Sequence, residues 1–117
     1  MKLIVAIIRP ERLEAVQHAL NERDVYLMTV SDVRGCGRQR GYTELYRGNE
    51  VQIRLIPKLK LEIAVNEPFV EATIEAIVHA ARTGTTGNIG DGKIFVISLE
   101  DSVRIRTGER GPESIGP

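Results

Sequence analysis

The chain has 117 residues, of which 42% are hydrophobic, and its 16 basic and 16 acidic side chains balance, which is typical of one small globular domain. The balanced charge excludes a general attraction to nucleic acid or to a membrane surface. A lone cysteine, Cys36, excludes a disulfide within the chain and suits a reducing cytoplasm, and every apolar run is far shorter than the ~20 residues of a membrane-spanning helix.

The first third of the sequence predicts a strand, a helix and a second strand. Residues 3–8 form an apolar run of strand length, which we expect to be buried on both faces. Pro10 suits a first helical turn, and apolar residues at spacings of three and four over 11–22 indicate an amphipathic helix. β-Branched and aromatic residues over 25–34 favour a second strand.

The rest of the sequence predicts a strand, a helix, a strand and a tail. Residues 51–65 alternate between apolar and polar side chains, as in a long strand with one buried face, and Pro57 indicates a bulge or an edge position there. Residues 67–81 form a helix with one apolar face, which consists of Val70, Ile74, Ile77, Val78 and Ala81. Residues 94–99 form a last strand, and 103–107 form a short extended piece. The order β-α-β-β-α-β predicts an α+β fold of the ferredoxin-like kind.

This fold serves many functions, so the function has to be inferred from the site. RNA-recognition domains share the fold, but they stack bases on aromatic residues of their central strands. The runs LIVAII and LKLEIAV contain no aromatic residue. RNA binding is therefore set aside.

Four polar features are candidates for ligand binding. GDGK at residues 90–93 combines flexible backbone with a lysine, although a plain Asp-Gly turn is the simpler explanation of this motif alone. Arg104 and Arg106 would place two cations on one face of an extended segment, which suits an anion or a solvated strand face. Arg38 lies within the glycine-rich GCGRQRG, and Lys58 lies on the polar face of a strand.

Taken together, these features favour a binding protein over an enzyme. Arg38, Lys93, Arg104 and Arg106 would surround two glycine-rich turns with four cations, which matches a triphosphate. The sequence has no Cys–His pattern of a structural zinc site and no apparent pair of nucleophile and base.

Three stretches of the sequence resemble the PII family of nitrogen-regulatory signalling proteins. They are RGCGRQRGYTELYRG followed by IPKLKLEI, then TGNIGDGKIFV, and finally VRIRTGE, and the resemblance runs nearly from end to end with one gap. It implies a cytoplasmic homotrimer with nucleotide sites between subunits. It also implies that residues 37–54 form the T-loop that contacts partners, that 83–93 form the phosphate loop, and that 103–117 form the C-terminal segment.

The resemblance also assigns roles to individual residues, which we state as expectations. The residues around ATP or ADP would be Ile7, Thr29, Gly35, Gly37, Arg38, Gln39, Ala64, Gly90, Asp91, Gly92 and Lys93, with Arg104 and Arg106 reaching in from a neighbouring subunit. The residues around 2-oxoglutarate would be Gln39, Gly41, Lys58 and Gly90. Gln39 would also hold Mg²⁺ with the ATP phosphates, because this ion prefers oxygen ligands.

The resemblance implies partner contacts as well. Tyr46 and Arg47 would contact the partner, foremost an ammonium channel and otherwise an enzyme or regulator of nitrogen metabolism. The protein would thus reach a membrane only through a partner.

Two departures from the family pattern stand out. Members regulated by covalent modification carry a tyrosine after YRG or a serine near it, whereas this chain has Asn49 and Val51, which excludes modification at these two positions. The stretch TGTTGN at residues 83–88 makes the phosphate loop three residues longer than in relatives. We therefore expect nucleotide affinity or the preference between ATP and ADP to be altered.

Two other functions remain open from the sequence. One is a PII-like sensor of a different small molecule, such as bicarbonate or another nucleotide, although Gln39 and Lys58 argue against it. The other is a small phosphate-ester or acyl-phosphate hydrolase on the same fold, which a turnover assay would distinguish.

Overall fold

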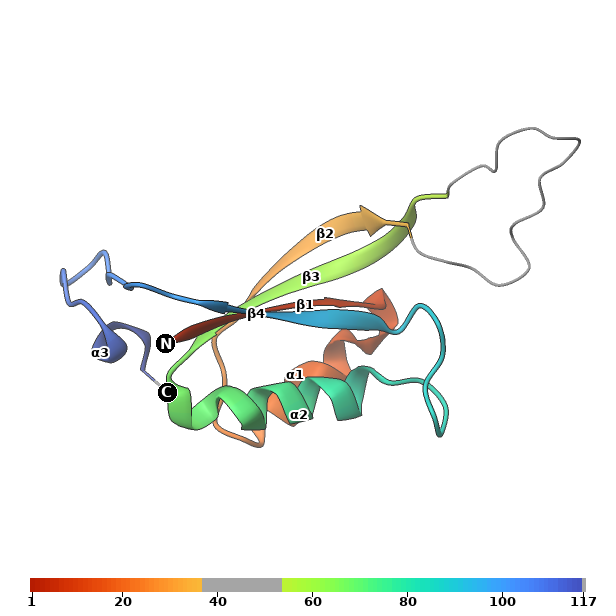
Figure 1. Ribbon diagram of the computed structural model, residues 1–117, viewed down its shortest axis with the longest axis horizontal. Helices are drawn as coiled ribbons and strands as arrows, with labels where there is room; N and C mark the ends of the chain where they lie inside the picture. The colour runs from red at the N-terminus through yellow and green to blue at the C-terminus, as the bar shows by residue number, and fades with distance from the viewer. Residues whose placement is uncertain (37–53, 117) are drawn as a thin grey trace, which may run out of the picture.

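The computed structural model of the protein describes residues 1–36 and 54–116. Four strands form one antiparallel sheet in the order β2-β3-β1-β4, and helices α1 and α2 lie together on one face of it (Figure 1). This is the predicted ferredoxin-like α+β fold. The elements are β1 (Lys2–Ile8), η1 (Pro10–Arg12), α1 (Leu13–Asn21), β2 (Thr29–Gly35), β3 (Ile56–Val65), η3 (Glu67–Phe69), α2 (Val70–Ala81), β4 (Gly92–Ser98) and α3 (Pro112–Ile115).

Burial alternates along the two central strands. The buried side chains face the helices and form the centre of the core, namely Ile4, Ala6 and Ile8 of β1 and Leu59, Leu61, Ile63 and Val65 of β3. The expectation that β1 is buried on both faces is wrong for the single chain, because Leu3, Val5 and Ile7 are only half-buried. Both helices cover the same face, and no helix of the described residues covers the second, open face of the sheet.

The helices begin and end close to the predicted residues. Pro10 opens the turn η1 that leads into α1, and Val16 and Leu20 of α1 are buried. In α2, Val78 was expected on the buried face but is 39% exposed. Thr73 lies in the core instead, and its hydroxyl donates a hydrogen bond to the carbonyl of Phe69 at 2.7 Å, which satisfies the polar group. None of the helices described is long and apolar enough to cross a membrane.

The second strand begins later than the predicted 25–34. Val25 is buried and its N–H bonds to the carbonyl of Leu20 at 3.0 Å, so the chain is still attached to the helix layer there. Tyr26 and Leu27 are exposed while the chain crosses to the sheet, and pairing with β3 starts at Thr29. The β-branched and aromatic residues that predicted the strand therefore extend over the connection between α1 and β2 as well as over β2 itself.

The third strand is described from Ile56, and the predicted positions 51–53 lie outside the described residues. Leu55, expected on the buried face, is 59% exposed, because it precedes the strand. Pro57 pairs with Arg34 of β2 in an unbroken register, while pairing with β1 ends at Leu59. Pro57 thus occupies an edge position on its β1 side, where it has no ladder bond to donate.

The C-terminal segment, residues 99–116, differs from the expected extended piece. Val103 forms an isolated bridge with Arg110, and residues 105–107 form a turn between them. The N–H of Gly108 donates to the carbonyl of Arg104 at 2.7 Å, and positive φ angles at Gly108 and Gly111 allow the chain to reverse. The premise that Arg104 and Arg106 share one face of a strand is therefore wrong. The short helix α3 that follows was not predicted.

Candidate functional site

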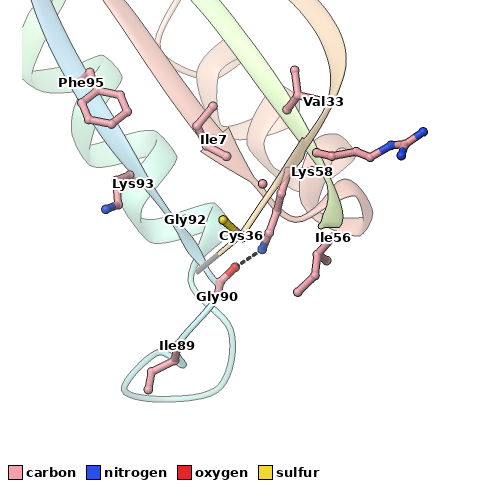
Figure 2. Close-up of a pocket in the computed structure, with 12 residues that line it drawn as sticks. Ile7, Val33, Cys36, Ile56, Lys58, Ile89, Gly90, Gly92, Lys93 and Phe95 are labelled. Atoms are coloured by element: carbon pink, nitrogen blue, oxygen red, sulfur yellow. Dashed lines mark hydrogen bonds between the residues drawn. The ribbon is translucent and has the colours of Figure 1, made fainter. Parts of the chain in front are cut away.

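A cavity of about 560 Å³ lies at the end of the sheet where β1 and β2 end and β3 and β4 begin (Figure 2). The pairings of Ile8 with Gly92 and of Gly35 with Ile56 bring these four strand ends together. The lining is apolar along one wall and cationic or glycine-rich elsewhere. It consists of Ile7, Val33, Arg34, Gly35, Cys36, Ile56, Lys58, Ile89, Gly90, Gly92, Lys93 and Phe95. The volume is that of a small-molecule or cofactor site.

Glycine is required at two positions of the loop beside this cavity. A Cβ at Gly92 would lie 1.7 Å from the carbonyl oxygen of Ile7, and the φ angle there is +110°. A Cβ at Gly90, where φ is +102°, would lie 3.0 Å from the guanidinium nitrogen Nη2 of Arg9. The last turn before β4 therefore packs its bare backbone directly against β1 and its end.

Asp91 organises this loop from within. Its carboxylate accepts hydrogen bonds from the hydroxyl of Thr83 at 2.6 Å, from the N–H groups of Thr83 and Asn88 at 2.9 Å each, and from Nε of Arg9 at 3.0 Å. Desolvation would raise the pKa of Asp91, but these hydrogen bonds outweigh it and hold the pKa well below its usual range. The side chain of Asp91 is thus committed to the loop, and a ligand would meet the backbone around it.

Arg9 is the residue that sequence reasoning missed. Besides its ion pair with Asp91, its Nη2 donates to the carbonyl of Ile89 at 3.1 Å. The position of Arg9 could have been inferred from the predicted fold, because a ferredoxin-like sheet places the end of the first strand beside the start of the last. The register that pairs Ile8 with Gly92 then makes Arg9 a neighbour of Asp91.

Lys58 reaches across the cavity from β3. Its Nζ donates to the carbonyl of Gly90 at 2.5 Å, as Figure 2 shows. Burial lowers the pKa of Lys58, the nearby Arg9 lowers it further, and the carboxylates of Glu11 and Asp91 oppose this shift. A partly desolvated ammonium beside a second cation is stabilised by any anion that enters the cavity.

The structure brings together about half of the predicted site residues within one chain. Those that line the cavity are Ile7, Gly35, Lys58, Gly90, Gly92 and Lys93, and Asp91 lies directly behind it. Thr29 and Ala64 do not line it. Thr29 lies four residues along β2 from Val33 and Ala64 six residues along β3 from Lys58, which are separations of ~13 and ~20 Å in a strand.

Arg104 and Arg106 follow β4, whose last residue, Ser98, pairs with Lys2 at the end of the sheet opposite to the cavity. The guanidinium of Arg104 bonds to the carboxylate of Glu109 and to the carbonyls of Glu113 at 3.0 Å and Ser114 at 3.3 Å. Arg106 is exposed. Neither arginine can thus reach the cavity of its own chain.

The remaining predicted site residues lie outside the described residues. They are Gly37, Arg38, Gln39, Gly41, Tyr46 and Arg47, together with Asn49 and Val51.

A divalent cation would depend on oxygen atoms from elsewhere. Residues 1–36 and 54–116 hold no group of three His, Cys, Asp or Glu side chains that could bind a metal ion. The carboxylate of Asp91, directly behind the cavity, is already engaged by four donors. The described residues therefore do not form a Mg²⁺ site by themselves, and such an ion would need further oxygen ligands.

The fold and the cavity define the chain as a small ferredoxin-like protein with a cavity at the end of its sheet that lysines and a glycine-rich turn line. Comparison with known proteins gives a more specific identity. The sequence model of the family "Nitrogen regulatory protein P-II" matches residues 1–109. The chain belongs to the P-II family of nitrogen regulatory proteins, and this confirms the resemblance found in the sequence.

Similar proteins match over nearly their whole length. The chain is 53% identical over 115 residues to nitrogen regulatory protein GlnK1 of Methanosarcina mazei, which covers 98% of this chain and 97% of that protein. The same identity and coverage relate it to nitrogen regulatory protein P-II 2 of Methanothermobacter thermautotrophicus. Nitrogen regulatory protein P-II of Rhodospirillum rubrum is 50% identical over 98% of this chain and all of its own length.

Proposed function

We propose that this protein senses ATP or ADP together with 2-oxoglutarate and transmits the ligand state to proteins of nitrogen assimilation or ammonium transport. The observation that carries the proposal is the convergence of Lys58, Lys93 and the glycine turn at Gly90–Gly92 on one cavity with an apolar wall. A nucleotide has the matching parts, since its base and ribose are partly apolar and its phosphates are anionic.

The cavity suggests how the two parts of a nucleotide would be divided. Ile7, Val33 and Phe95 would offer an apolar surface to the base and ribose, while Lys93 and the backbone of Gly90 would bind the phosphates. Arg38 would add a further cation, and Gln39 would hold Mg²⁺ jointly with the phosphate oxygens.

Lys58 is the proposed partner of 2-oxoglutarate. Its ammonium is partly desolvated and, within residues 1–36 and 54–116, donates a hydrogen bond only to the backbone carbonyl of Gly90, at 2.5 Å. A carboxylate is a stronger partner for an ammonium than a neutral carbonyl, so 2-oxoglutarate would displace this bond. Mg²⁺ on the γ-phosphate and Gln39 would hold the other end of the ligand, which makes binding dependent on MgATP.

We further propose a homotrimer. The open face of the sheet carries half-buried or exposed apolar side chains, among them Leu3, Val5, Phe95 and Ile97, which a second copy would cover. Thr29, Ala64, Arg104 and Arg106 lie away from the cavity of their own chain, so they would act at the cavity of a neighbouring copy. Light scattering at micromolar concentration is expected to give three times the mass of one chain.

The proposed role is regulatory and not catalytic. In this proposal the protein is cytoplasmic and binds no nucleic acid. Tyr46 and Arg47 contact an ammonium channel, or an enzyme or regulator of nitrogen metabolism, and this partner provides the only link to a membrane. A pull-down from cell extract, with and without ATP and 2-oxoglutarate, would identify the partner.

Calorimetry tests the proposed ligands. ATP with Mg²⁺ is expected to bind the wild type, and 2-oxoglutarate is expected to bind only in its presence and to tighten ATP binding by the same factor, because such coupling is reciprocal. Lys58→Met should abolish this coupling while ATP affinity stays nearly the same. A wild-type ATP titration that 2-oxoglutarate leaves unchanged would refute the assignment of this effector.

A further inference from the structure

Three successive backbone carbonyls before β4 are each held by a donor. The carbonyl of Asn88 accepts from the N–H of Asp91 at 3.1 Å, that of Ile89 from Nη2 of Arg9 at 3.1 Å, and that of Gly90 from Nζ of Lys58 at 2.5 Å. Two of the three donors are cationic side chains from other elements. The peptide groups of this turn are therefore fixed from outside the turn.

This arrangement determines where the N–H groups of the turn point. In a planar trans peptide the N–H lies opposite the carbonyl, so holding the carbonyls of Asn88 and Ile89 turns the N–H groups of Ile89 and Gly90 the other way. Within residues 1–36 and 54–116, no atom accepts a hydrogen bond from either N–H. Both residues line the cavity. Two adjacent backbone donors without a partner are a suitable arrangement for an anion.

Arg9 is well suited to hold this turn. The residue that follows it is Pro10, which restricts Arg9 to extended backbone, and its φ and ψ angles of −68° and 139° agree. From this fixed position one guanidinium bonds to both the carboxylate of Asp91 and the carbonyl of Ile89. The same group packs against Gly90, where a Cβ would lie 3.0 Å from its Nη2.

We propose that Arg9 is a positioning residue of the nucleotide site, which holds the Ile89–Gly90 peptide so that its N–H faces the phosphate chain. This inference rests on the proposed function. Arg9 acts through the turn, because it does not line the cavity and its Nε and Nη2 are already engaged by Asp91 and Ile89.

The test compares Arg9→Gln, Arg9→Lys and a control, Arg23→Gln, by calorimetry with ATP and with adenosine. Arg23 is a suitable control because its Nη1 also donates to a backbone carbonyl, that of Ala19 at 3.0 Å. This bond joins residues at the C-terminal end of α1 and does not involve the turn before β4. Arg9→Gln should weaken ATP binding about 10- to 100-fold, as expected for loss of charge-assisted hydrogen bonds that orient the donors. Adenosine, which has no phosphate, should bind all variants alike, and Arg9→Lys should recover part of the loss.

A second measurement uses the protein without nucleotide. Amide exchange followed by NMR should be faster at Thr83, Asn88 and Asp91 in Arg9→Gln than in the wild type, because these N–H groups are bonded within the loop that Arg9 holds. Unchanged exchange, unchanged ATP affinity, or an equal loss for ATP and adenosine would each overturn the inference. If the wild type does not bind ATP, the nucleotide assignment fails instead, and the exchange comparison alone decides whether Arg9 orders the turn.

Discussion

The two ends of the sheet are stabilised in different ways. At the cavity end, Arg9 and Lys58 bond to residues of the glycine-rich loop that lie 82, 80 and 32 positions away in the sequence. In the C-terminal segment, the ion pairs Arg104–Glu109 and Arg110–Asp101 join residues only five and nine positions apart. The glycine-rich loop is therefore bonded to distant parts of the chain, whereas the C-terminal segment bonds mostly within itself.

This difference separates a fixed part of the proposed site from an adjustable one. The C-terminal segment touches the rest of the chain through few polar contacts, such as the bonds from the Asn66 amide to the carbonyls of Pro112 at 3.1 Å and Gly116 at 2.6 Å. It can therefore move without disturbing the core. The glycine-rich loop cannot move without breaking contacts to β1 and β3, so changes there should cost more stability.

The largest effect is expected at Gly92. Gly92→Ala would place a Cβ 1.7 Å from the carbonyl oxygen of Ile7, which only a separation of β1 and β4 can relieve. Overpacking and the unfavourable φ angle together should cost at least about 3 kcal/mol of unfolding free energy in a urea titration. Gly108→Ala in the C-terminal segment is the control, because nothing lies within 4 Å of its Cβ position. It should cost about 1–2 kcal/mol, and equal losses would contradict the contrast between the two regions.

A smaller effect is expected at Asp91. Asp91→Asn weakens hydrogen bonds to an ionised group and should cost about 1–3 kcal/mol at pH 7. Because the pKa of Asp91 is lowered in the folded protein, its contribution is present above the usual carboxylate pKa and is lost as the pH falls toward the folded value. The difference from wild type should therefore be constant from pH 7 to about pH 5 and shrink below about pH 4.

Asp101→Asn is the matched control for Asp91→Asn. The pKa of Asp101 is also lowered, chiefly by its hydrogen bond from Arg110, but this pair lies at the surface of the C-terminal segment. Its substitution should change the unfolding free energy less than that of Asp91 at every pH. A larger loss for Asp101→Asn would reverse our ranking of the two regions.

Deletion of Thr85, Thr86 and Gly87 should have a modest effect on stability. The carboxylate of Asp91 joins Thr83 to Asn88 and so closes the intervening residues into a loop outside the cavity lining. Shortening a surface loop should change the unfolding free energy by no more than about 1 kcal/mol. The deletion also shortens the spacing between Thr83 and Asn88, whose side chains bond to each other, so ATP or ADP affinity should change. Unaltered affinity for both nucleotides would show that the extra residues are neutral.

The smallest effect is expected from removing residues 112–117. The four-residue helix α3 contains no buried side chain, and truncation should change the unfolding free energy by only about 0.5 kcal/mol. It also frees Nη2 of Arg104 from the carbonyls of Glu113 and Ser114. A loss as large as that of Asp91→Asn would mean that this segment is part of the stable core.

The order of elements and the core residues could be predicted from the sequence, because the spacing of apolar residues and the length of apolar runs indicate helices and strands locally. The alternation over residues 59–65 and the apolar helical faces correspond to the buried residues observed. The late start of β2 at Thr29 and the turn after Val103 were not predictable in this way. The start of β2 follows the crossing of the chain from the helix layer to β3, and the turn after Val103 follows a bridge to Arg110 in the same segment, and neither feature has a sequence period.

The same limit applies to the site. Glycines and lysines with functional potential were visible in GDGK and at Lys58, since glycine-rich turns beside cations are rare enough to notice. Arg9 and the inward role of Asp91 have no local signature, and only the strand order of the predicted fold could have indicated them. Their roles follow only from the register between the first and last strands, which places residues 82 positions apart in contact.

That register also determines when the cavity comes into existence during folding. β1 is the first strand made but lies between β3 and β4, and the cavity is complete only when β4, the last strand of the sheet, has paired with it. Pairing β1 with β4 closes a loop of most of the chain, and the entropy cost of this closure slows folding. The stabilisation from the pairing comes only after β4 has been synthesised. A nascent or truncated chain that lacks β4 therefore lacks the proposed ligand site, and ligand binding there would stabilise only molecules in which β4 has been made and paired.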